Sequence, residues 1–176
     1  TEGRALVALG HVAMSHGRVE QMREYNRQAV AAFRLAGNKR REAACHSNIG
    51  MALYLDGELE LACDELEQAA STLALHGDVM ILNECYTNLA TIYIALQRAD
   101  DAEKVARSLL ENARNAGLSQ QQALAYALLS EAQLGRDQEA ALHNAREGNR
   151  LVAEAGNDME RAYLGRVMAD ALMANA

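Results

Sequence analysis

The residues of this chain that could perform chemistry are five histidines, three cysteines and several neighbouring carboxylates. No histidine stands in an HExxH motif or at a cysteine–histidine spacing typical of a zinc site. His143 lies between Glu139 and Glu147 on one predicted helix face, which is the pattern of a solvated ion-pair ladder. No glycine-rich phosphate loop is present. We therefore expect no catalytic residues, no metal site and no cofactor.

The cysteines are Cys45, Cys63 and Cys85. An odd number without close pairs argues against a disulfide framework and favours a reducing compartment, so we expect a cytoplasmic protein. No cationic neighbour is placed to lower the pKa of a thiol, which argues against a cysteine nucleophile. No apolar run approaches the roughly 18 residues of a membrane span, and no signal peptide is visible.

The charge balance argues against a nucleic-acid partner. The chain has 17 Lys and Arg against 24 Asp and Glu, a net charge of −7. Affinity for nucleic acid depends on neutralising backbone phosphates, which an acidic chain does poorly. The one basic run is Lys39-Arg40-Arg41, with Arg34 nearby. It falls at a predicted junction between helix pairs, where we interpret it as a solvated turn.

A repeat of about 40 residues organises the sequence. Small residues recur in register along it, with Met22 as the exception, and a glycine closes each unit. The three series are Gly10, Gly50, Ala90 and Ser130; Met22, Ala62, Ala102 and Ala141; and Gly37, Gly77, Gly117 and Gly156. Small side chains at fixed positions let neighbouring helix backbones approach closely. The pattern therefore predicts paired helices, with units at about 3–37, 38–77, 78–117 and 118–156.

Helical spacing of apolar residues and the punctuation between runs place the elements. The predicted helices cover residues 3–15, 18–36, 39–55, 58–76, 79–96, 99–116, 119–134, 137–155 and 158–174. The unit-closing glycines fit left-handed positions after helix C-termini. The predicted N-caps are Asn38, Asp78, Ser119 and Asp158. No strand is needed, so we expect one all-α solenoid domain over 1–176. Since it opens at Thr1 without an initiator Met, we interpret it as part of a longer protein.

The small–large alternation resembles the tetratricopeptide repeat. Tyr86, Leu89, Ala90, Tyr93 and Ala102 carry the resemblance best. The usual period is about 34 residues, and the usual proline after the second helix is absent. The longer form is similar to the repeats of kinesin light chains and of MalT-like bacterial regulators. The resemblance implies a right-handed α–α superhelix of four helix pairs plus a C-terminal helix.

In that family the first helix of each pair lines a concave groove. The corresponding positions here are Arg4, Val7, Ala8 and His11; Ala44, Ser47, Asn48 and Met51; Glu84, Thr87, Asn88 and Thr91; and Leu124, Ala127, Leu128 and Glu131. We take Met51 and the polar members of this set as candidate peptide-binding residues. They are Arg4, His11, Ser47, Asn48, Met51, Glu84, Thr87, Asn88, Thr91 and Glu131.

Asn48 and Asn88 are the sharpest candidates because they stand one repeat apart in helix interiors, where asparagine is mildly unfavourable. An asparagine amide both donates and accepts hydrogen bonds, so the pair could clamp an extended peptide backbone. The alternative is that both amides bond to a neighbouring helix or to water. Val7 and His11 stand where the family's carboxylate clamp has Lys and Asn, which argues against chaperone-tail recognition.

The resemblance therefore implies a scaffold that binds a protein or an extended peptide, as the sensor or partner-binding region of a bacterial multidomain regulator. One alternative is self-association through exposed terminal helices, and another is a small-ligand sensor. The apolar residues of the terminal helices are Leu6, Val7, Leu9 and Val12, and Tyr163, Leu164, Val167, Met168 and Leu172. No nucleic-acid or membrane partner is expected.

Overall fold

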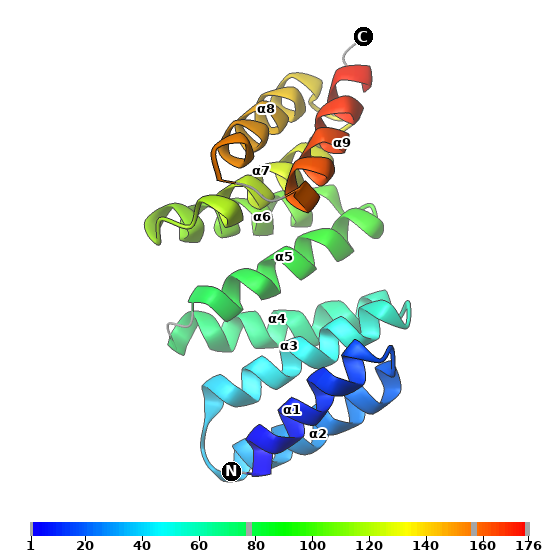
Figure 1. Cartoon of the computed structure of the whole chain (residues 1–176), viewed down its shortest axis with the longest axis vertical. Helices are drawn as coiled ribbons and strands as arrows, with labels where there is room; N and C mark the ends of the chain where they lie inside the picture. The colour runs from blue at the N-terminus through cyan, green and yellow to red at the C-terminus, as the bar shows by residue number, and fades with distance from the viewer. Residues whose placement is uncertain (1, 77–78, 156–157, 175–176) are drawn as a thin grey trace. The chain divides into compact units, whose positions relative to one another are not determined.

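The computed structural model describes residues 2–76, 79–155 and 158–174, and these residues form helices joined by short turns (Figure 1). The helices of this described part are α1 (Glu2–Ser15), α2 (Val19–Leu35), α3 (Lys39–Leu55), α4 (Leu59–His76), α5 (Val79–Ala95), α6 (Ala99–Asn115), α7 (Ser119–Gln133), α8 (Gln138–Ala155) and α9 (Asp158–Ala174). Each boundary lies within one residue of the prediction. The all-α expectation is confirmed, since the described ranges contain no strand.

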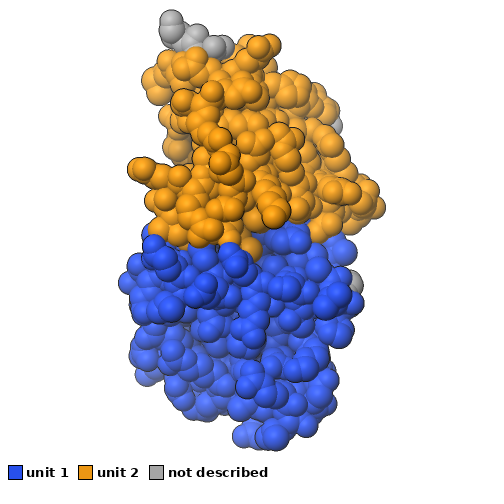
Figure 2. Space-filling model, turned by 180° about the vertical axis from the view of Figure 1, so that it is seen from behind, with its two compact units in different colours: residues 1–88 blue, residues 89–176 orange. Residues whose placement is uncertain are grey.

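The chain forms two compact units, residues 1–88 and 89–176 (Figure 2). In unit 1, α1 packs on α2, α2 on α3, and α3 on α4. In unit 2, α6 packs on α7, α7 on α8, and α9 on both α7 and α8. Apart from α7 and α9, each of these pairs joins helices that are consecutive in the sequence, as the short connections predict.

Several helices are followed by a residue with a positive φ angle. Gly37 and Gly117 have φ of 66° and 67°, which confirms their predicted left-handed role. Asn38 caps α3, because its side chain accepts a hydrogen bond from the Arg41 backbone N–H at 3.1 Å. The prediction for Ser119 is wrong: Leu118 is the N-cap residue of α7, without a side-chain cap bond, and Ser119 is already helical.

The remaining predicted helix ends are only partly covered by the structure. Gly77, Asp78 and Gly156 lie outside the described residues. α9 begins at Asp158 itself, whose side chain is not described. The turn between the helices of the third pair uses Gln97, at φ 57°, where the equivalent turns use Gly17 and Gly57.

The recurring small residues lie at close helix contacts. Ala62, Ala102 and Ala141 are fully buried. A Cβ atom added to Gly50 would lie 2.7 Å from Leu66 Cγ and 3.2 Å from the Ala62 carbonyl oxygen, both on α4. These distances confirm that the small-residue register allows paired helices to approach closely.

Candidate functional site

The candidate surface in unit 1 centres on Asn48 of α3, whose side chain is half-buried. Its Nδ2 donates a hydrogen bond to Asn26 Oδ1 of α2 at 2.9 Å. Asn26 is fully buried, and its own Nδ2 donates to the Met22 carbonyl oxygen at 2.8 Å. One N–H of Asn48 is therefore used inside the fold. Among the described residues, its second N–H and its carbonyl oxygen have no hydrogen-bond partner.

Asn88 of α5 differs from Asn48 although it occupies the equivalent position. Its side chain is also half-buried, but it makes no hydrogen bond to any residue that the structure describes. The residue equivalent to Asn26 is Leu66, which offers no acceptor. The full hydrogen-bonding capacity of the Asn88 amide is therefore available to solvent or to a ligand.

Three other candidates accompany the asparagines in unit 1. Met51 is half-buried and packs against a cluster that includes Ala13 and Met22. The Thr87 hydroxyl donates a hydrogen bond to the Asn83 carbonyl oxygen at 2.9 Å, within α5. Glu84 is exposed. This face therefore combines amide groups, an apolar side chain and one carboxylate.

Ser47 does not contribute to this surface, which corrects the sequence prediction. Its side chain is buried, 6% exposed, and is hydrogen-bonded to the side chain of Cys85 on α5. The reason is the rotation of α3, which directs Ser47 into the contact with α5 instead of toward solvent.

Arg4 and His11 are exposed on α1. Arg4 lines a hollow of about 540 Å³, walled by the start of α1, the end of α2 and the start of α3. The ring of Phe33 forms part of this hollow, and the Arg41 guanidinium lies over that ring at 5.7 Å from its centroid.

Thr91 and Glu131 belong to unit 2. Thr91 is half-buried. Glu131 of α7 accepts hydrogen bonds from Arg166 at 2.8 Å and from the Tyr163 hydroxyl at 3.2 Å, both on α9. Its charge is thus matched within the fold. Glu131 therefore connects α7 to α9 through these two hydrogen bonds.

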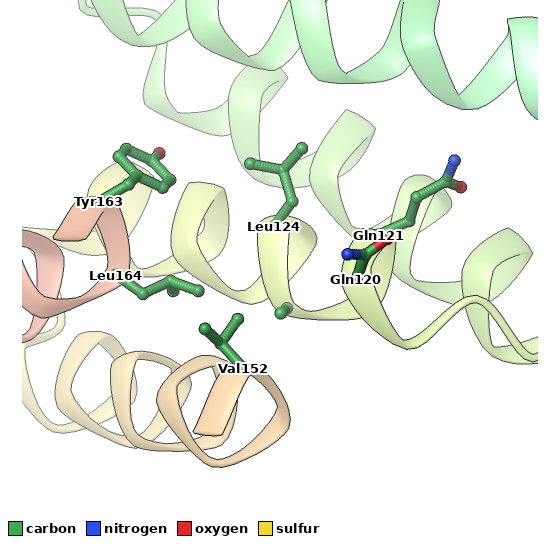
Figure 3. A pocket seen from close by; sticks show the side chains of 7 residues that line it. Gln120, Gln121, Leu124, Val152, Tyr163 and Leu164 are labelled. Atoms are coloured by element: carbon green, nitrogen blue, oxygen red, sulfur yellow. The ribbon is translucent and has the colours of Figure 1, made fainter. Parts of the chain in front are cut away.

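Unit 2 contains a pocket of about 230 Å³ that sequence reasoning missed (Figure 3). Residues from α7, α8 and α9 line it, and they are Gln120, Gln121, Ala123, Leu124, Val152, Tyr163 and Leu164. These positions are separated by long stretches of sequence, so only the packing of the three helices brings them together. Leu124, a family groove position, was the one available signal.

The titratable groups of the described chain give no support for nucleophilic or metal chemistry. Cys45, Cys63 and Cys85 are buried, and none of them forms a disulfide with a described residue. Burial raises the pKa of Cys45 to about 12 and that of Cys85 to about 11, so both thiols are protonated at neutral pH. No group of three or more His, Cys, Asp or Glu side chains that could hold a metal ion occurs among the described residues.

Part of the basic run is engaged in ion pairs. Arg34 and Lys39 both bind the carboxylate of Glu42, at 2.8 and 2.9 Å, across the junction between α2 and α3. The interpretation of this run as part of a turn is consistent with that arrangement. No described helix is both long enough and apolar enough to cross a membrane.

Comparison with known proteins finds matches to helical-repeat proteins. The model of the tetratricopeptide repeat family matches residues 84–115. Among curated protein sequences, none is significantly similar to this chain. Solved structures match nearly its whole length. Aspartyl phosphate phosphatase F from Bacillus subtilis has a TM-score of 0.86 at 13% identity, covering 98% of this chain and 47% of the phosphatase.

Two further structures show the same fold. Kinesin light chain repeats from Podospora anserina match with a TM-score of 0.80 and 17% identity, covering 98% of this chain and 85% of theirs. The apo form of RapI matches with a TM-score of 0.84 and 11% identity, covering 99% of this chain and 68% of RapI. The chain therefore contains a match to the tetratricopeptide repeat at residues 84–115, and over nearly its whole length it shares the helical-repeat fold of these structures. It spans about half of the phosphatase that it resembles.

Proposed function

We propose that this chain is a scaffold that binds another protein by holding an extended segment of it across α3 and α5 of unit 1. The observation that carries the proposal is the pair Asn48 and Asn88, half-exposed and one repeat apart on these helices. Peptide backbone groups come as donor–acceptor pairs, and an asparagine amide complements both at once.

The two asparagines would have unequal roles. Asn48 is held in one orientation by Asn26, so its carbonyl oxygen is pre-positioned to accept a peptide N–H. Pre-positioning reduces the conformational entropy lost on binding. Asn88 has no such partner in the described chain and can pair with both groups of one peptide unit. Met51 supplies an adaptable apolar contact beside them.

A selection experiment tests this proposal. A peptide library displayed on ribosomes is selected against the purified chain, and the strongest ligand is measured by fluorescence anisotropy. We expect Asn88→Ala to weaken that ligand at least tenfold with an unchanged melting temperature. Asn115→Ala, at an exposed position near the end of α6, is the matched control and should change neither. Equal affinity of the Asn88→Ala variant would refute the role of this face.

The biological setting proposed for this scaffold is the sensor or partner-binding region of a multidomain bacterial regulator. The fold match to RapI and to the phosphatase from Bacillus subtilis is compatible with such a setting. The three free cysteines favour a reducing cytoplasm. A neighbouring nucleotide-binding or DNA-binding domain in the full-length gene would support the regulator, and a gene without one would contradict it.

Self-association is the second candidate, favoured by exposed apolar side chains on the terminal helices. Leu9, Val12 and Met14 of α1 are 46%, 55% and 47% exposed. On α9 the sequence expectation needs correction. Leu164 and Val167 are buried in the core of unit 2, because α9 packs on α7 and α8.

Leu172 and Met173 remain exposed on α9. Sedimentation velocity at rising protein concentration tests for self-association. A sedimentation coefficient independent of concentration would exclude this candidate.

A further inference from the structure

The hollow of about 540 Å³ in unit 1 lies where the start of α1, the end of α2 and the start of α3 meet (Figure 1). Its volume falls in the roughly 300–1,000 Å³ range of ligand sites. Every residue that lines it is among those that the structure describes. The chemistry of an occupant can therefore be inferred from the lining itself, which combines apolar side chains with three charged ones.

The apolar part of the hollow has a fixed wall and an exposed edge. The ring of Phe33 is buried, 5% exposed, and a Cβ added to Gly3 would lie 2.9 Å from it, so α1 holds the ring in place. Leu35, which also lines the hollow, is 92% exposed. A guest that covers Leu35 with an aliphatic side chain would remove apolar surface from water, which is favourable.

Arg41 supplies a half-buried cation without a counter-ion in the described chain. Its guanidinium lies over the Phe33 ring, 5.7 Å from the centroid, and forms no ion pair with any described residue. The half-buried Arg23 is different, because three carboxylates surround it, those of Glu20, Asp56 and Glu58. A partly dehydrated guanidinium gains most from a charge-assisted hydrogen bond. Arg41 is therefore suited to an anionic group of a guest.

The charge balance of the hollow favours an acidic guest. Arg4 is exposed and also forms no ion pair with a described residue, and Glu2 is the one carboxylate of the lining. Two cations therefore face one anion. Beside the hollow, Arg34 and Lys39 share the single carboxylate of Glu42, at 2.8 and 2.9 Å. This positive excess stands in a chain whose net charge is −7, so an acidic segment would be attracted here and repelled by most of the remaining surface.

From the unpaired arginines, the exposed apolar edge and the volume together, we propose that this hollow binds an acidic segment of a partner protein. Arg4 and Arg41 bind a carboxylate of that segment, and an aliphatic side chain next to the carboxylate packs against Leu35. The inference does not rest on the asparagine face, because Asn48 and Asn88 are not among the residues that line the hollow. Either site could fail its test without deciding the other.

Chemical-shift titration of the ¹⁵N-labelled chain tests the hollow. The probes are acetyl-Asp-Leu-Glu-Leu-Asp-amide, its uncharged counterpart acetyl-Asn-Leu-Gln-Leu-Asn-amide, and inorganic phosphate. We expect the acidic peptide to shift the backbone amide resonances of Gly3, Phe33 and Leu35 and to bind at least tenfold more tightly than either of the other probes. The uncharged peptide lacks the carboxylates, and phosphate lacks the aliphatic side chain.

Substitutions at the charged lining residues sharpen the test, because their effects should differ in sign. Arg41→Gln should weaken the acidic peptide at least tenfold, and Arg4→Gln at least threefold, since each removes a cation. Glu2→Gln removes the competing carboxylate and should tighten the same peptide at least twofold. Arg27→Gln, at an exposed position on α2 outside the hollow, is the matched control and should change the affinity less than twofold.

If circular dichroism shows that Arg41→Gln is unfolded, Arg4→Gln and Glu2→Gln decide the test, because both of these side chains are exposed. The proposal would be overturned by an acidic peptide that leaves the three resonances unshifted, or by equal binding of the uncharged peptide or of phosphate. Unchanged affinity in the folded arginine variants, or weaker binding to Glu2→Gln, would overturn it as well.

Discussion

Asn48 on α3 donates to the fully buried Asn26 on α2 at 2.9 Å, and the next repeat replaces this pair by Asn88 and Leu66. Removing the donor alone leaves the Asn26 oxygen buried without its bond, which costs about 1–3 kcal/mol. We therefore expect Asn48→Ala to lower the free energy of unfolding by at least about 1 kcal/mol. Asn88→Ala, which breaks no described bond, should leave it within about 0.5 kcal/mol.

A double-mutant cycle with Asn26→Leu measures how much the Asn26–Asn48 hydrogen bond contributes to the free energy of unfolding. Leu66 already fits beneath Gly50 in the equivalent place, so leucine should fit at position 26 beneath Gly10. With no buried acceptor left, Asn48→Ala in the Asn26→Leu background should cost less than about 0.5 kcal/mol. Urea denaturation of the four proteins measures the coupling. Additive effects would show that the Asn26–Asn48 bond contributes nothing to stability.

Gly50 and Gly165 give opposite predictions for the same substitution. Gly50→Ala places a methyl group 2.7 Å from Leu66 Cγ, so α3 and α4 must separate or Leu66 must move. Overpacking of this kind costs about 1–3 kcal/mol. Gly165 lies on the exposed side of α9 with nothing within 4 Å of an added Cβ. Gly165→Ala should instead stabilise the helix by about 0.5–1 kcal/mol. Thermal melts of the two variants should move in opposite directions, and a neutral Gly50→Ala would contradict the close helix contact.

The helix boundaries could be predicted from the sequence because local residues determine them. Glycines and Asn38 punctuate runs that contain no proline, and the 40-residue spacing repeats the same signals. Side-chain exposure could not be predicted in the same way. Ser47 and Asn48 are neighbours in sequence and both are family groove positions, but only Asn48 reaches the surface. The difference depends on the rotation of α3 against α2 and α5.

The same reasoning explains which parts of the sites were missed. Asn26 was detectable, because a polar residue stands where the other repeats have Leu66, Ala106 and Ala145. The pocket of unit 2 was not detectable from the sequence, because its shape depends on how closely α7, α8 and α9 pack together. Spacing along one chain does not encode the distance between three helices.

The contribution of the ionised Glu42 carboxylate to the free energy of unfolding should depend on pH. Hydrogen bonds from Lys39 and Arg34 lower its pKa below the ordinary 4.5, in spite of its burial. A carboxyl group with a lowered folded-state pKa contributes stability above its unfolded pKa and loses that contribution as pH falls through the folded value. Glu42→Gln should therefore destabilise the chain by about 1–2 kcal/mol at pH 7.

The difference between Glu42→Gln and the wild type should shrink as pH falls below 4.5, because wild-type Glu42 then becomes neutral as well. Glu111→Gln, at an exposed position on α6, is the control and should change stability by less than about 0.5 kcal/mol at pH 7. Urea midpoints across this pH range measure both variants. A Glu42→Gln penalty that persists unchanged at acid pH would mean that packing, and not charge, is responsible.

Gln97 has a backbone conformation that glycine adopts in the equivalent turns. Its φ is 57°, and those of Gly17, Gly57 and Gly135 are 68°, 80° and 79°. A residue with a Cβ pays roughly 1–2 kcal/mol in the left-handed region, partly offset because glycine loses more entropy on folding. We expect Gln97→Gly to stabilise the chain by about 0.5–1 kcal/mol, which raises the melting temperature by roughly 1–4 °C for a chain of this size.

Gly57→Gln should have the opposite effect with a similar magnitude, since an added Cβ there meets nothing within 4 Å and the cost is backbone strain alone. A destabilising Gln97→Gly would show that the Gln97 side chain contributes more to this turn than its strained φ costs.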